Sequence, residues 1–163
     1  MRKFIRMNGK TKTIVKDYEF SLAEYISEEN FERIKRLSEG KETPFLIMDL
    51  DVVRDKYNEI KNNLPFAKIY YAIKANPMHE VISLLRDLGS NFDIASVYEL
   101  DQLLAIEVSP DRISYGNTIK KAKDIKYAFE KGVNLFASDS LTDLKNIAEN
   151  APGSRIFFRL LTD

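Results

Sequence analysis

A lysine at the end of a short apolar segment is the feature of this sequence with the clearest chemical meaning. Residues 68–74 read as a strand that ends at Lys74, and Ala75-Asn76-Pro77 follows with residue types that begin a helix. Burial favours the neutral form of an amine, and a neutral amine attacks carbonyl groups. Lys74 is therefore a candidate for covalent chemistry with an aldehyde or ketone, and pyridoxal phosphate is the commonest such cofactor. The alternative is a lysine that extends its charged end into water and has no chemical role.

The composition narrows the class of protein. The chain has 163 residues, of which 44% are hydrophobic and 31% charged, and this balance is typical of a folded domain. A formal net charge of zero argues against a nucleic-acid partner, and the absence of cysteine, with His79 as the one histidine, argues against most metal sites. No secretory signal is evident and no apolar run approaches the ~20 residues of a membrane span, so we expect a cytoplasmic protein that uses neither a membrane nor a metal.

The chain divides into a polar N-terminal part and a more regular remainder. We predict an N-terminal extension over residues 1–43, with one helix from Ser27 to about Leu37. Residues 44–163 are predicted to form the first part of a barrel. They open with an apolar strand at Phe45–Met48, followed by a helix over roughly Val52–Asn62.

Strand and helix patterns then alternate along the chain. Strands are predicted to begin near Ile69, Phe92, Ile113, Leu135 and Ile156. A helical pattern follows each of the first four, which predicts a parallel sheet covered by helices. The even spacing favours a parallel (β/α)8 TIM barrel over a dinucleotide-binding fold, and no Gly-x-Gly-x-x-Gly follows any strand. Only about five of the eight βα units are present, so we expect the chain to be incomplete as a folding unit.

Polar side chains follow the carboxyl ends of the predicted strands, where active sites of such barrels lie. They are Lys74, Asp93–Ser96, Asn117, Asp139 and Arg159–Asp163. Because these ends share one mouth of the barrel, we expect a lysine, carboxylates, an amide and an arginine to converge there. A carboxylate beside Lys74 would stabilise its charged form.

Several of these residues also have purely structural interpretations. Glu99 follows Ser96 at the spacing of a capping box, which competes with a role in a site. Asp139 is a candidate helix cap, Asn117 a turn residue, and His79 a solvated residue in a helix's first turn. A group of lysines is interpreted as a wet helix face, at positions 120, 121, 123 and 126.

Four segments together resemble one family. They are Phe45–Leu50, Tyr70–Pro77, Phe92–Ser96 with Glu99, and Ile113–Lys120. They are similar, in order along the chain, to the fold-type III pyridoxal-phosphate decarboxylases, whose barrel is of the alanine-racemase type. Within that group they look most like the ornithine and the bacterial lysine/ornithine decarboxylases.

The resemblance implies a set of roles. The family's Schiff-base lysine falls on Lys74, its aspartate near the cofactor on Asp93, its fifth-strand arginine on Arg159 and its glutamate on Glu99. These four would bind pyridoxal 5'-phosphate, with Lys74 also catalytic. The implied reaction is decarboxylation of ornithine or lysine to a diamine for polyamine biosynthesis, in a homodimer.

Other parts of the family's site fall outside residues 1–163. They are a histidine, a glycine-rich phosphate loop and a glutamate on later barrel strands, and a C-terminal β domain that reads the substrate. We therefore expect the isolated chain to bind cofactor poorly and to be inactive. Two alternatives stay open: another barrel enzyme that uses the same lysine, such as an amino-acid racemase, and a non-catalytic truncated barrel that acts as a regulatory pseudoenzyme.

Overall fold

The computed structural model describes residues 26–162. The chain divides into two compact units, with the boundary along the sequence between Met48 and Asp49. In the first unit, helix α1 spans Glu28–Ser38. The Ser27 hydroxyl accepts a hydrogen bond from the Asn30 N–H, so the predicted cap is confirmed. The strand expected at Phe45–Met48 is wrong, because this segment pairs with no other strand among the described residues.

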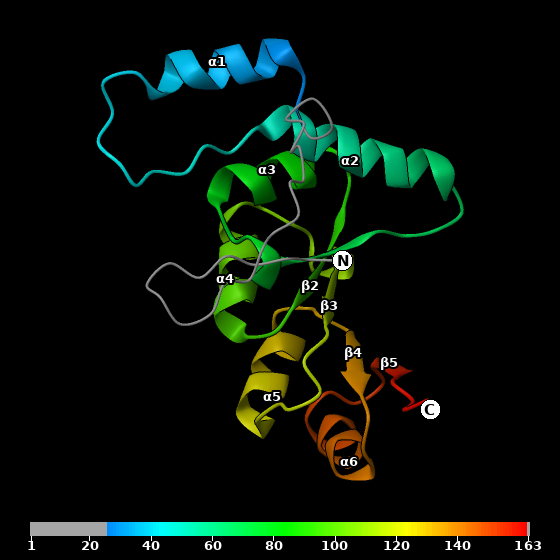
Figure 1. Ribbon diagram of the computed structural model, residues 1–163. Coiled ribbons are helices and arrows are strands. Elements are labelled where there is room, and N and C mark those ends of the chain that lie inside the picture. Colours follow the sequence, from blue (N-terminus) through cyan, green and yellow to red (C-terminus); the bar gives the residue numbers. More distant parts are fainter. Residues whose placement is uncertain (1–25, 163) are drawn as a thin grey trace, which may run out of the picture. The chain divides into compact units, whose positions relative to one another are not determined.

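The second unit is built on one parallel sheet of five strands (Figure 1). The strands are β1 (Tyr70–Ala72), β2 (Asn91–Ile94), β3 (Ile113–Tyr115), β4 (Leu135–Ser138) and β5 (Arg155–Phe158). They lie side by side in the same order as in the sequence, and every neighbouring pair is parallel. A doubly wound sheet reverses its strand order near the middle, whereas an unreversed order is that of a barrel segment. The predicted barrel architecture is confirmed for the five units present.

Helices alternate with these strands. They are α2 (Leu50–Asn63), α3 (His79–Asp87), α4 (Val97–Ala105), α5 (Ala122–Glu130) and α6 (Leu141–Asn150), with short 3₁₀ turns η2 (Ile73–Ala75) and η3 (Pro110–Arg112). Because right-handed crossovers between ordered parallel strands always return on the same side, α3 to α6 cover one face of the sheet (Figure 1). Helix α3 begins two residues after Pro77, because the Asn76 side chain accepts the Met78 N–H and forms a turn there first.

The core lies between the sheet and its helices. Side chains alternate along β2, where Phe92 and Ile94 are fully buried and Asp93 points to the opposite face. On β3 and β4 the rings of Tyr115 and Phe136 stack with centroids 6.0 Å apart. Full burial of each such apolar side chain stabilises the fold by roughly 1.5–3 kcal/mol, so this face holds the unit together.

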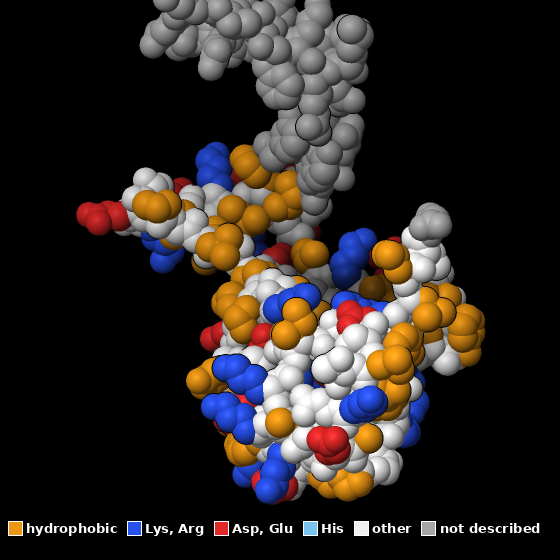
Figure 2. All heavy atoms as spheres, turned by 90° about the horizontal axis from the view of Figure 1, so that it is seen from below, with side chains coloured by type: hydrophobic (Ala, Val, Ile, Leu, Met, Phe, Trp, Pro, Cys, Tyr) orange, Lys and Arg blue, Asp and Glu red, His pale blue; other side chains and the backbone are white. Residues whose placement is uncertain are grey.

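The sheet face opposite these helices carries the polar side chains and some exposed apolar ones. Along and after the edge strand β5, on either face, Phe157, Phe158, Leu160 and Leu161 are all exposed. Figure 2 shows hydrophobic side chains gathered in patches between scattered charged ones. Within residues 26–162, no helix combines the length and apolar character required to cross a membrane.

Candidate functional site at the carboxyl ends of the strands

A hollow of about 470 Å³ lies on the sheet face away from helices α3 to α6. It is lined by Tyr70, Ala72, Asp93, Ser114, Gly116, Leu135, Phe157 and Arg159. The lining side chains come from all five strands or from the residues directly after them, so the parallel sheet itself brings them together. Two of the predicted site residues, Asp93 and Arg159, therefore share one hollow, as their strand-end positions indicate.

Asp93 is the most electrostatically constrained group in this hollow. It is half-buried on β2, and the Ser114 hydroxyl donates a hydrogen bond of 2.6 Å to its Oδ1. Burial raises the pKa of the Asp93 carboxyl above its ordinary value, while the Ser114 hydrogen bond and the charges of Lys74 and Arg159 act to lower it. Two cations from opposite edges of the sheet thus act on one carboxylate.

Lys74 lies in η2, immediately after β1. The strand ends at Ala72, and the turn that follows buries Ile73 completely while it leaves Lys74 exposed. The expectation of a buried amine at a strand's last residue is therefore wrong for this chain, because the 3₁₀ turn presents Ile73, not Lys74, to the core. The positive charge of Lys74 nevertheless acts on the Asp93 carboxyl group and favours its ionised form.

Arg159 follows β5 and makes two contacts at the same end of the sheet. Its Nη2 lies 3.3 Å from the Thr118 hydroxyl and 3.4 Å from Asp139 Oδ2. A hydrogen bond with Thr118 and the nearby Arg159 charge both lower the pKa of the Asp139 carboxyl. Asp139 is not the cap of the next helix, since the Ser140 hydroxyl accepts the Asp143 N–H and fills that position.

Glu99 lies apart from the hollow, in the first turn of α4. Its Oε2 accepts the Ala95 N–H at 2.5 Å, while the Ser96 hydroxyl accepts the Glu99 N–H at 3.3 Å. This is the reciprocal arrangement of a capping box, displaced by one residue at its start. The capping interpretation is confirmed, and a role for Glu99 toward a cofactor stays a prediction.

The capping role of Glu99 can be tested by its contribution to stability. Glu99→Ala is expected to lower the free energy of unfolding by about 1 kcal/mol, because the Ala95 N–H loses its acceptor. Glu99→Gln retains an acceptor oxygen and is expected to lose only about 0.3 kcal/mol, the lower end of the value of a charge at a helix N-terminus. Urea unfolding of both variants measures the difference, and equal losses would contradict the capping assignment.

Two smaller interpretations are confirmed. Asn117 serves its turn, because its Oδ1 accepts the Ile119 N–H and its Nδ2 donates to the Ala95 carbonyl. His79 is the first residue of α3 and is exposed. Neither side chain lines the hollow around Asp93.

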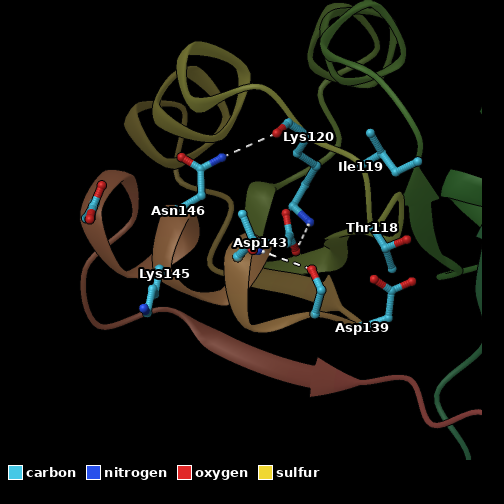
Figure 3. A pocket seen from close by; sticks show the side chains of 10 residues that line it. Thr118, Ile119, Lys120, Asp139, Asp143, Lys145 and Asn146 are labelled. Carbon is cyan, nitrogen blue, oxygen red and sulfur yellow. Dashed lines mark hydrogen bonds and ion pairs between the residues drawn. The ribbon is translucent and has the colours of Figure 1, made fainter.

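Figure 3 shows a second hollow, of about 660 Å³, between the β3–α5 loop and α6. Here Lys120 is buried, and its Nζ donates to Asp143 Oδ2 at 2.8 Å and to the Asn117 and Ala137 carbonyls at 2.9 and 2.7 Å. The interpretation of Lys120 as part of a wet helix face is wrong, because α5 begins only at Ala122 and the preceding loop turns Lys120 inward. The three other lysines of that group are exposed.

The donor set around Asp93 fits a carbonyl-containing organic cofactor better than a metal. Among the described residues, no cluster of three or more histidine, cysteine or acidic side chains is placed to hold a metal ion. The hollow of about 470 Å³ falls in the usual size range of small-molecule sites, and it offers a carboxylate, a guanidinium and, at its mouth, an amine. The described lining supplies no second cation for a phosphate group.

The fold and this site define a class: a (β/α) barrel segment with a lysine, an aspartate and an arginine at the carboxyl ends of its strands. Residues 50–163 match the family model for the pyridoxal-dependent decarboxylase, pyridoxal binding domain. The chain therefore belongs to the pyridoxal-dependent decarboxylase family, and residues 50–163 are similar to its pyridoxal binding domain. The resemblance inferred from its sequence motifs is confirmed.

Individual relatives agree with this assignment. The chain is 42% identical to the ornithine decarboxylase of Saccharomyces cerevisiae over 76% of its own length, and 36% identical to the lysine/ornithine decarboxylase of Selenomonas ruminantium over 78%. These matches cover 27% and 32% of the relatives, so the chain spans about a third of their length or less. It is also 37% identical, over 73% of its length, to antizyme inhibitor 2 of Xenopus laevis, and covers 26% of that protein.

Solved structures share the fold. SrLDC, the lysine decarboxylase of Selenomonas ruminantium, superposes with a TM-score of 0.75 at 35% identity in its complex with PLP and cadaverine. The lysine/ornithine decarboxylase of Vibrio vulnificus in complex with putrescine gives a TM-score of 0.75 at 30% identity. Each match covers 83% of this chain, and 35% and 37% of the two structures.

Proposed function

We propose that the full-length protein carrying this chain is a pyridoxal-phosphate-dependent decarboxylase of ornithine, lysine or both. The observation that supports this most directly is the electrostatic grouping of Lys74, Asp93 and Arg159 at the carboxyl ends of three strands. The family assignment and the relatives named for ornithine and lysine agree with it. When bound, pyridoxal phosphate supplies an electron sink for the electron pair released with carbon dioxide.

Each residue of the chain has a distinct task in this proposal. The Lys74 amine binds the cofactor's aldehyde, and its exposure at the mouth leaves it open to a ligand from solvent. Asp93 supplies a carboxyl group near it: burial raises the pKa of this group, and the charges of Lys74 and Arg159 favour its carboxylate form. Arg159, oriented by Thr118 and Asp139, presents a rigid guanidinium to the same hollow.

The finer parts of the proposal concern the whole protein. We infer a cytoplasmic homodimer that makes a diamine such as putrescine or cadaverine for polyamine biosynthesis. Solved relatives that hold these two diamines support the choice of product. The exposed apolar side chains Phe157, Phe158, Leu160 and Leu161 support closure of the sheet by further strands, since a closed barrel covers such an edge.

The direct test is to supply full-length protein with pyridoxal phosphate and each candidate amino acid, and to measure released carbon dioxide and the amine product. Ornithine and lysine are expected to give putrescine and cadaverine. Interconversion of L and D amino acids without carbon dioxide release would instead indicate a racemase. Residues 1–163 expressed alone are expected to show no measurable turnover, so robust activity of that piece would contradict the division of the site proposed here.

A second candidate is a non-catalytic regulator. The observation that favours it is the similarity to antizyme inhibitor 2, a relative named for a protein it inhibits and not for decarboxylation. A full-length protein that folds, binds no pyridoxal phosphate and releases no carbon dioxide from any basic amino acid would support the regulator. Release of carbon dioxide from a basic amino acid would exclude it.

A further inference from the structure

Asp93 is held from two sides by residues of β3 and the turn after it. The Ser114 hydroxyl donates to Asp93 Oδ1 at 2.6 Å, and its next acceptor, the Phe92 carbonyl, is much farther at 3.4 Å. Ser114 is buried, so water does not compete freely for its single proton. The hydroxyl therefore has one good acceptor, the carboxylate of the neighbouring strand.

Gly116 forms the other side of this contact. A Cβ atom at position 116 would overlap both oxygens of the Asp93 carboxylate and its carbon. The backbone φ of Gly116 is an ordinary one, and its N–H bonds to the Ile94 carbonyl at 2.9 Å as part of the regular ladder. A side chain at position 116 would therefore have to displace the Asp93 carboxylate, whereas the backbone conformation by itself would accept one.

We propose that Ser114 is a positioning residue for Asp93. Because glycine has no side chain, position 116 leaves the space that the Asp93 carboxylate occupies. The pairing of the two strands fixes the arrangement, since Asp93 and Ser114 are directly opposed in the parallel register. A carboxylate that is hydrogen-bonded on one oxygen and packed against backbone keeps a single orientation. That orientation keeps the carboxylate against Ser114 and Gly116, where the charges of Lys74 and Arg159 act on it.

This inference rests on the proposed function, because the orientation of Asp93 matters most if Lys74 holds the cofactor. The charged groups that act on Asp93 are Lys74 from the β1 side and Arg159 from the β5 side, and Tyr70 lines the same hollow. Ser114 contributes no charge, so its removal changes a hydrogen bond and leaves these charges in place. Loss of a bond to the carboxylate form is expected to raise the pKa of Asp93.

The test uses full-length protein labelled with ¹³C at aspartate carboxyl carbons, with the Asp93 signal assigned by its loss in Asp93→Asn. Ser114→Ala is expected to move the Asp93 titration midpoint to higher pH, and Ser114→Thr, which keeps the hydroxyl, to restore it. Gly116→Ala is expected to shift the midpoint in the same direction, because the carboxylate must leave the hydroxyl. An unchanged midpoint in Ser114→Ala, or no restoration by threonine, would overturn the proposal.

The same variants separate this inference from the function itself. If the wild-type protein neither binds pyridoxal phosphate nor decarboxylates, the proposed function fails while the titration still decides the role of Ser114. If the wild type is active, Ser114→Ala is expected to lower kcat/KM by about 10-fold, the value of one charge-assisted hydrogen bond, and to displace the acidic limb of the pH profile to higher pH. An activity loss of that size with an unmoved acidic limb would assign Ser114 a merely structural role.

Discussion

Replacement of Lys74 by alanine in the full-length protein is expected to lower decarboxylase activity by at least about 10³-fold, the order of loss seen when a covalent nucleophile is removed. The reason is chemical: Lys74 would hold the cofactor through its primary amine, and alanine offers no amine. An absorbance band of the lysine-bound cofactor, expected when pyridoxal phosphate is added to the wild type, should be missing from Lys74→Ala. Borohydride reduction followed by peptide mass spectrometry should find the label on Lys74 in the wild type.

Lys68 provides the matched control for this prediction. It is also exposed and belongs to the same lysine-flanked segment, but it precedes β1 at the opposite end of the strand. Lys68→Ala is expected to keep both the absorbance band and the activity, since parallel strands place their amino ends away from the site. A Lys74→Ala protein that retains the band and near wild-type turnover would rule out the covalent role of Lys74 while leaving the fold assignment intact.

The chain position of Lys74 was predictable from sequence, but its environment was not. Alternating hydrophobic residues indicate where β1 lies, and the helix signals of Asn76 and Pro77 indicate that it ends nearby. Whether the last residues continue the strand or form a 3₁₀ turn depends on tertiary packing, and here Ile73 takes the buried position. The prediction of a buried amine was wrong because the strand ends at Ala72 and a 3₁₀ turn follows it.

Contacts between strands explain why the sequence identified Asp93 but missed Ser114 and Gly116. A carboxylate at a strand end indicates a candidate site residue, whereas a serine and a glycine within an apolar segment carry no such indication. Their importance depends on the register of β2 against β3, which pairs Asp93 with Ser114. Strand alternation alone could have placed Ser114 on the same face as Asp93, but not at hydrogen-bonding distance.

The buried ion pair between Lys120 and Asp143 was missed for a similar reason. The two residues are 23 positions apart and belong to different βα units. Lysines at positions 120, 121, 123 and 126 look alike in the sequence, and only the course of the β3–α5 loop separates the first from the others. A run of charged residues predicts a solvent-exposed segment. It cannot identify a single residue of the run whose side chain is buried.

This ion pair supports the prediction with the largest expected effect on stability. Lys120 donates all three ammonium protons: one to Asp143, one to the Asn117 carbonyl and one to the Ala137 carbonyl (Figure 3 shows the surrounding residues). Its side chain is completely buried, and Asp143 Oδ1 already lacks a partner within the described structure. Lys120→Ala would leave a buried carboxylate without its cation and remove one donor from each of two carbonyls, so it is expected to lower the free energy of unfolding by about 3–5 kcal/mol.

A double-mutant cycle makes the prediction specific to the pair. Asp143→Ala is expected to cost a similar amount, because it leaves a buried ammonium. Lys120→Ala combined with Asp143→Ala should cost well below the sum of the single losses, since no uncompensated charge remains. Lys123→Ala, on the exposed face of α5, serves as the control and should stay within about 0.5 kcal/mol of the wild type. Urea unfolding of the full-length protein measures all four; single losses below about 1 kcal/mol, or strictly additive ones, would show that Lys120 reaches water and that the pair does not anchor α6 to the sheet.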